Sequence, residues 1–331
     1  MKGLGNQSLF DVDPSSSELG SAPGLWALMQ VPGVGSTTAL KLAQAYSSWE
    51  QLAASPVDAL AKVKARRVDP HLLATLAMDP CQPPTMDDDV WLVGYFDPDY
   101  PSRLQQIASA PAVLWVRGTA PTGNAAAVVG TRNPTRGGVD RVHKVVSVLV
   151  STGYGIVSGL ATGIDTTAHE AALAEGGRTW AYLGSGVDYP TPRENVELAE
   201  RIVAAGGGLL AEVDPGTKPS ARTLVARDRL QSGTSSLTVI GQSGIPSGTL
   251  HTARFAIEQE RSLVVVAPPA SESEDPAWAG NRALCDPGGC DPKILNADGG
   301  LAERIAARKP TADHVLRKAD TLVGVLDQGL N

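Results

Sequence analysis

The stretch "VSGLATGIDTTAHEAALAEGG", from Val157 to Gly177, runs from apolar residues through a glycine loop into an alanine-rich segment. Its composition predicts a buried strand followed by a helix, since β-branched residues favour strands and alanine favours helices. Gly159 and Gly163 flank the loop, and Asp165 is placed to cap the helix. His169 falls on the same helix face as Asp165, so it is either a packing residue or a group whose pKa the carboxylate raises.

Similar apolar runs recur along most of the chain, separated by segments of helical composition. Including the run that ends at Gly159, the predicted strands are 112–118, 125–131, 154–159, 179–184, 208–212, 236–241 and 262–268. Strands that alternate with helices form a parallel sheet covered on both faces, so the predicted fold class is doubly wound α/β. Ligands of such sheets bind beyond the carboxyl ends of the strands.

The rest of the chain divides by composition into shorter segments. We expect a flexible Ser- and Gly-rich leader at 1–22, a small all-helical domain at 23–79, a linker rich in proline and aspartate at 80–89, the sheet domain at 90–310 and a short tail at 311–331. The tail is too short for an additional winged-helix domain, which we therefore do not expect.

Composition narrows the class of protein. With 331 residues, 42% of them hydrophobic and 19% charged, the chain has the composition of a globular protein. A net charge of −7 excludes a globally basic surface, so any nucleic-acid contact depends on a local patch. Three cysteines without a C-x-x-C pair fit a reducing cytosol and argue against structural zinc, and no stretch approaches the ~20 apolar residues of a membrane helix. We expect a cytoplasmic protein without metal or cofactor.

The stretch "VVGTRNPTRGG" at 128–138 is the first candidate phosphate site. A predicted strand leads into Gly130, Thr131, Arg132 and Asn133. Glycine lets the backbone approach a phosphate, the threonine hydroxyl and the following amides can donate to it, and the arginine adds a bidentate fork. The alternative is an ordinary strand-to-helix turn with a surface arginine.

A second candidate site lies in residues 224–259, where Arg227 and Arg229 precede a strand. After that strand, Ser247, Gly248 and Thr249 open a helix, whose free amides attract anions. Taken alone, the two arginines and the Ser-Gly-Thr stretch are equally consistent with a solvent-exposed basic turn and an ordinary glycine turn. Because the loops of one parallel sheet project from the same edge, their convergence favours a shared phosphate-binding pocket.

The sequence "VPGVG" at 31–35 predicts a hairpin between two helices. Gly33 and Gly35 can offer backbone amides to a nucleic-acid phosphate. However, Ser36 and the two threonines after it stand where a strong DNA binder carries basic residues, so a hairpin that only packs is an equal alternative.

The order of these motifs resembles the DprA/Smf family, the DNA-processing protein A family. The resemblance spans roughly residues 25–285 and rests on several stretches in family order. They are "VPGVG" at 31–35, "YPSRLQQIASAPAVLWVRG" at 100–118, "VVGTRNPT" at 128–135, "VSGLATGIDTTAH" at 157–169, "YLGSGVDYPTPREN" at 182–195, "SGTLHTARFAIEQ" at 247–259 and, weakly, "GNRAL" at 280–284.

The resemblance implies an extended Rossmann-like sheet domain behind a small helical domain with a helix-hairpin-helix-like motif. It also implies a homodimer that binds single-stranded DNA and loads a RecA-type recombinase during natural transformation or recombination, a binding role without catalytic residues. Asp165 and His169 are then expected to order the loop at the pocket mouth. The implied phosphate-binding residues are Gly130, Thr131, Arg132, Asn133, Ser158, Gly159, Gly163, Asp165, Gly184, Arg227, Arg229, Ser247, Gly248 and Thr249.

The chain departs from the family pattern at several of these motifs. Thr162 replaces the arginine of Gly-Leu-Ala-Arg-Gly-Ile-Asp, and Ala226 and Asp228 alter Phe-Pro-x-Arg-Asn-Arg. Gly241-Gln242 stands for Glu-Ala, and Pro268-Pro269 stands for Pro-Gly. Each lost phosphate contact weakens nucleic-acid binding and flattens its salt dependence, so we expect weaker DNA binding than the family norm or a different ligand.

Two other readings remain open from the sequence. The first is a nucleotide-binding sensor, or a nucleoside-monophosphate hydrolase of the wider Rossmann-like group, whose catalytic glutamate would fall at Thr252. A threonine cannot replace that carboxylate as a general acid or base. The second is a purely structural role, which the missing arginines support.

Overall fold

The computed structural model describes residues 13–327, and the chain divides into two compact units. The first unit is Met1–Tyr100 with Ala108–Leu114, and the second is Pro101–Ile107 with Trp115–Asn331. The expected leader therefore lies partly outside the described residues. No helix among residues 13–327 is long and apolar enough to cross a membrane.

The first unit is mainly helical. It contains a short 3-10 turn at Pro14–Ser16 and α1 (Ala22–Met29), α2 (Ser36–Ala45), α3 (Trp49–Ala54), α4 (Pro56–Lys62), α5 (Pro70–Met78) and strand β1 (Val90–Gly94). Ser21 caps α1 by accepting a hydrogen bond from the Gly24 amide, 3.1 Å away. Leu19 is fully buried, so the expectation of a loose leader up to residue 22 is wrong for its last residues.

The predicted hairpin at 31–35 connects α1 and α2. Gly33 has a φ of +90°, a left-handed conformation in which a Cβ is strained. Gly35 precedes the first residue of α2 and has open space around it. Both glycines are exposed, so their backbone faces solvent.

The second unit contains the mostly parallel sheet. Its first strand in the chain, β2, begins with two residues that are assigned to the first unit. The strands are β2 (Val113–Gly118), β3 (Ala125–Val129), β4 (Gly155–Ser158), β5 (Thr179–Tyr182), β6 (Gly208–Ala211), β7 (Leu237–Ile240), β8 (Ser262–Val266) and β9 (His314–Leu316). Their order is β2-β6-β5-β4-β3-β7-β8-β9, and every pairing is parallel except that of β2 with β6. Each predicted apolar run contains a strand, which confirms the mostly parallel sheet.

The expectation of a short tail after residue 310 is wrong. Residues 314–316 form β9, which pairs with β8 in register Val265 to Val315. The helix α14 (Thr321–Asp327) follows, and its Leu322 joins the core under α7. Only three residues make the strand, so its alternation is too short to read from sequence.

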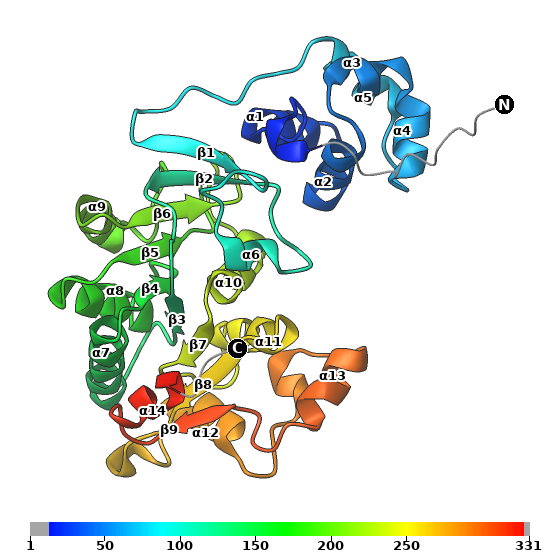
Figure 1. The fold of residues 1–331 in the computed structure, drawn as a ribbon. Coiled ribbons are helices and arrows are strands. Elements are labelled where there is room, and N and C mark those ends of the chain that lie inside the picture. Colours follow the sequence, from blue (N-terminus) through cyan, green and yellow to red (C-terminus); the bar gives the residue numbers. More distant parts are fainter. Residues whose placement is uncertain (1–12, 328–331) are drawn as a thin grey trace. The chain divides into compact units, whose positions relative to one another are not determined.

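Helices cover both faces of the sheet (Figure 1). On one face lie α7 (Arg136–Ser151), α8 (Ile164–Ala174) and α9 (Val196–Ala204), and on the other lie α10 (Ala221–Thr234), α11 (Thr249–Glu258), α12 (Ala279–Cys285) and α13 (Gly299–Ala306). Val128 packs into the α7–α8 core and its neighbour Val129 into the α11 core. Burial of both faces explains why these strands read as continuous apolar runs.

Candidate phosphate-binding pocket

A cavity of about 330 Å³ opens where the strand order reverses. The order β5-β4-β3-β7-β8-β9 is the 3-2-1-4-5-6 order of a Rossmann sheet, and its switch point lies between β3 and β7. The cavity lies at the carboxyl ends of these two strands. Its lining residues are Val129, Gly130, Thr131, Arg132, Ala161, Asp165, Ala221, Leu224, Val225, Arg227, Asp228, Gln231, Ser247, Gly248, Thr249 and Thr252.

The loop after β3 forms one wall and is held by backbone contacts. The Thr131 amide donates to the Gln242 carbonyl at 2.7 Å, and the Thr131 carbonyl accepts from the Ile164 amide at 3.1 Å. Gly130 is required here, because a Cβ would stand 2.6 Å from Ile164 Cγ1. Arg132 is exposed and makes no hydrogen bond or ion pair with any described residue, so its guanidinium is available to an anion.

The loop after β4 brings Asp165 to the cavity. Gly163 has a φ of +84°, and a Cβ there would lie 2.4 Å from the Thr131 carbonyl oxygen. Asp165 is not the cap that the sequence predicts: α8 begins at Ile164 after Gly163, and Asp165 Oδ2 accepts from the Ala161 amide at 3.4 Å. Burial raises the pKa of Asp165, and the nearby Arg227 charge opposes that shift.

Arg227 lies inside α10 and is only 6% exposed. Its Nη1 donates to the carbonyl oxygens of Gly159 at 2.7 Å and Tyr182 at 2.6 Å, so it holds together the ends of β4 and β5. Its Nε lies 3.2 Å from Asp228 Oδ1. Arg227 is thus a buried clamp that also lines the cavity, rather than a free phosphate ligand.

Asp228 places a second carboxylate in the cavity. Burial raises its pKa to about 6, against the lowering effect of Arg227, and the Asp165 charge raises it further. The ionisable side chains that line the cavity are two arginines and two aspartates. When both aspartates are ionised, their two negative charges balance the two positive charges of the arginines, and the lining side chains carry no net charge.

The third wall is the start of α11. Ser247, Gly248 and Thr249 all line the cavity, and Thr249 is the first helical residue, as predicted. The Thr249 amide donates to Ser247 Oγ at 3.3 Å. The positive end of this ten-residue helix therefore faces the same space as Arg132.

Six predicted residues do not line the cavity. They are Asn133, Ser158, Gly159, Gly163, Gly184 and Arg229. Ser158 is buried and donates to the Val128 carbonyl at 2.7 Å, while Gly159 supplies a carbonyl to the Arg227 clamp. Arg229 pairs with Glu212 at 2.8 Å, and Gly184 packs against Leu224 so closely that a Cβ would lie 2.9 Å from its Cδ2.

His169 is not at the pocket mouth, contrary to what the resemblance implies. It is fully buried in α8, and its Nδ1 lies 2.7 Å from Thr179 Oγ1 on β5. The observed partner of His169 is therefore Thr179, whereas the sequence predicted Asp165. Burial lowers the pKa of His169 to about 3, with a further contribution from the Arg227 charge. The side chain is therefore a neutral packing residue beneath the sheet edge.

Apart from Arg227, the residues of α10 that line the cavity were not predicted from the sequence. Ala221, Leu224, Val225 and Asp228 stand at helical spacing, three or four residues apart, and all line the cavity. That spacing was the available signal. Within residues 13–327 no cluster of His, Cys, Asp and Glu is arranged to hold a metal ion.

This geometry defines a Rossmann-like α/β protein with a polar cavity at its switch point. The sequence profile of the DNA recombination-mediator protein A family matches residues 91–291, so the chain belongs to that family. It is 40% identical over 173 residues to Protein Smf of Synechocystis and 38% identical over 170 residues to DNA processing protein DprA of Bacillus subtilis. These alignments cover 50% of this chain, and 43% and 57% of the two relatives, so the chain spans about half the length of the curated relatives it matches.

Solved structures show the same fold. DNA processing protein A from Streptococcus pneumoniae superposes with a TM-score of 0.65 at 25% identity, over 79% of this chain and 90% of that one. The Helicobacter pylori protein, whose structure was described with its single-stranded DNA binding mode, superposes with a TM-score of 0.56 at 21% identity, over 72% of this chain and 96% of that one. The predicted family and Rossmann-like fold are confirmed.

Proposed function

We propose that this protein binds single-stranded DNA and loads a RecA-type recombinase on it, as a mediator of natural transformation or recombination. The observation that carries the proposal is the cavity at the switch point, where Arg132 and the start of α11 face one space in a member of a recombination-mediator family. A guanidinium that pairs with no described residue, placed beside helix amides, suits a backbone phosphate. The structurally similar protein from Helicobacter pylori, for which a single-stranded DNA binding mode is described, adds support.

In this role the protein is a cytoplasmic homodimer that binds DNA and does not catalyse a reaction. The pocket residues support this role, because Arg227 is engaged by backbone carbonyls and His169 is buried away from the cavity. The predicted phosphate ligands that we keep are Gly130, Thr131, Arg132, Ser247, Gly248 and Thr249. Gly33 and Gly35 remain proposed contacts in the other unit.

A nucleotide-binding or nucleotide-hydrolysing role is the second candidate, and one observation favours it. Asp165 and Asp228 stand together in the cavity, and the pKa of Asp228 is raised to about 6, within the range of a general acid or base. Thr252 lines the same cavity but offers no carboxylate. This candidate predicts saturable binding of a nucleoside monophosphate that competes with DNA.

The test is fluorescence anisotropy with a labelled single-stranded oligonucleotide, with duplex DNA and a nucleoside monophosphate as competitors. We expect Arg132→Ala to weaken single-strand binding by about 1–3 kcal/mol, the range for a lost charge-assisted hydrogen bond. Lys309→Ala removes an exposed cation that does not line the cavity and is the control. Unchanged affinity in Arg132→Ala refutes the pocket as the DNA site.

A further inference from the structure

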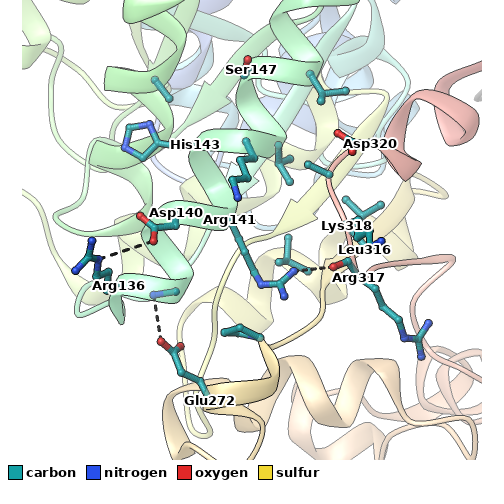
Figure 2. Close-up of a pocket in the computed structure, with 18 of the residues that line it drawn as sticks. Arg136, Asp140, Arg141, His143, Ser147, Glu272, Leu316, Arg317, Lys318 and Asp320 are labelled. Carbon is teal, nitrogen blue, oxygen red and sulfur yellow. Dashed lines mark hydrogen bonds and ion pairs between the residues drawn. The ribbon is translucent and has the colours of Figure 1, made fainter.

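A second, larger cavity of about 1100 Å³ runs along α7, beside the loops that follow β8 and β9 (Figure 2). Apolar residues form part of its lining, among them Val145, Val148 and Leu316. Arg141 Nη1 donates to the Arg317 carbonyl at 2.8 Å, which fixes the turn after β9 against α7. We call this cavity the α7 groove. It does not share a lining residue with the phosphate-binding pocket.

Cationic side chains outnumber carboxylates in the α7 groove, five to four, although the whole chain carries −7. Two of the carboxylates are engaged. Glu272 accepts from Thr135 Oγ1 at 2.6 Å and from the Gly137 amide at 3.1 Å, and Asp140 lies 3.9 Å from Arg136. The cations are Arg136, Arg141, Lys144, Arg317 and Lys318.

Lys144 and Lys318 are two of the unpaired cations of the α7 groove, beside Arg317. Both are exposed, and neither forms an ion pair with a described residue. None of the large exposed hydrophobic side chains among the described residues lines the groove, and two of its apolar lining residues, Val145 and Leu316, are buried. An extended polyanion fits these features better than a peptide does.

The topology places the α7 groove and the pocket at one edge of the sheet. The loops after β3 and β7 line the pocket. The loops after β8 and β9, the next strands in order, line one side of the groove, and α7 and the end of α8 line the rest. Parallel strands end at the same edge. In addition, α7 begins at Arg136, only four residues after the pocket residue Arg132.

We infer that the α7 groove is a second binding surface for the phosphate backbone of the same single strand that occupies the pocket. The inference rests on the proposed function. A strand long enough to leave the pocket continues along the sheet edge, where the groove cations neutralise its phosphates. Affinity therefore depends on strand length as well as on Arg132.

The test compares the double variant Lys144→Ala/Lys318→Ala with the control Lys293→Ala/Lys309→Ala, which removes the same charge at exposed lysines outside both cavities. Binding of oligonucleotides of about 6 and about 30 nucleotides is measured by anisotropy across a salt series. For the long strand, we expect the groove variant to make the negative slope of log K against log salt shallower by about 1.4, the value for two lost phosphate contacts. Short-strand binding stays as in the control.

Each other outcome overturns the inference. If the wild-type protein binds the long strand and the groove variant matches the control in affinity and slope, only the groove inference falls. If the groove variant loses short and long strands equally, the two lysines act on the pocket and the groove is not a separate surface. If the wild-type protein binds neither strand, the proposed function falls, and the groove inference falls with it.

Discussion

Asp228 is the side chain whose replacement tests the electrostatics of the pocket most directly. Its carboxylate lines the cavity, is 13% exposed and lies 3.2 Å from Arg227 Nε. Asp228→Asn keeps the shape of the side chain and removes the charge. Asparagine is also the residue that the family pattern carries at this position. We expect the variant to bind single-stranded DNA more tightly than the wild-type protein at pH 7.5.

The size of the effect follows from the size of the cavity. In a space of about 330 Å³, a bound phosphate lies within roughly 10 Å of Asp228. Two unit charges roughly 10 Å apart repel by about 1.7 kcal/mol at an effective dielectric constant of about 20. Screening by solvent at the open side reduces this energy, so we expect Kd to fall about 5- to 20-fold.

The pH dependence of DNA binding independently tests whether the charge of Asp228 weakens binding. An anion prefers the neutral form of Asp228, whose pKa is about 6, so wild-type binding strengthens as pH falls from 8 to 5. Asp165, Arg227 and Arg132 are the charged groups that face Asp228, and Asp165 also has a raised pKa. Asp228→Asn therefore flattens the profile around pH 6 and leaves only the contribution of Asp165.

The assay is anisotropy with an oligonucleotide without terminal phosphates, since phosphodiesters do not titrate between pH 5 and 8. Asp88→Asn, which neutralises an exposed carboxylate before β1, is the matched control. If Asp228→Asn has the wild-type Kd at pH 7.5 and the wild-type pH profile, then Asp228 does not face the bound phosphate, and the argument from the pocket charges is wrong.

Two further predictions concern the buried groups beneath the pocket. His169→Ala removes the Thr179 contact and leaves a cavity, so we expect a loss of about 2–4 kcal/mol in the free energy of unfolding by urea titration, with DNA binding of the folded protein retained. The pKa of His169 in the folded protein is about 3, so its neutral form stabilises the fold fully above pH 6.5. The wild-type protein loses this stability as the pH falls from 6.5 towards 3, whereas the variant has no such loss. Arg227→Ala leaves the carbonyls of Gly159 and Tyr182 without their donor, so we expect the free energy of unfolding to fall by about 3–5 kcal/mol in the same titration. A variant that is as stable as the wild-type protein but binds less DNA would instead support the predicted role of Arg227 as a free phosphate ligand.

Most of the fold follows from local sequence. The seven apolar runs are strands because both sheet faces are buried, and glycine, proline and polar residues separate them. The missed strands lack this signal: β1 is only partly buried, and β9 has three residues. The pairing of β9 also depends on β8, which ends at Val266 well before it in the chain, and no local pattern records such a contact.

The site was predictable only in part, for a reason that Arg227 and Arg229 make clear. The sequence places two arginines near a strand end, and both were expected to bind phosphate. In the structure one donates to backbone carbonyls and the other pairs with Glu212. Those partners come from other loops and strands, so the number of free cations depends on tertiary contacts. Arg132 differs because it stands in an exposed loop and forms no ion pair with any residue among 13–327.

The balance of charge also bears on which phosphate the pocket accepts. A phosphodiester in a nucleic-acid backbone carries one negative charge, whereas a terminal phosphomonoester carries about 1.5 to 2 at neutral pH. With Asp165 and Asp228 ionised, the lining side chains give no net attraction to offset the desolvation of that additional charge. The helix amides and Arg132 can neutralise one unit of charge at the mouth of the cavity, which suits a diester. Thus the same aspartates that we expect to weaken DNA binding should disfavour a nucleoside monophosphate still more, and the balance of charge favours a backbone ligand over the nucleotide alternative.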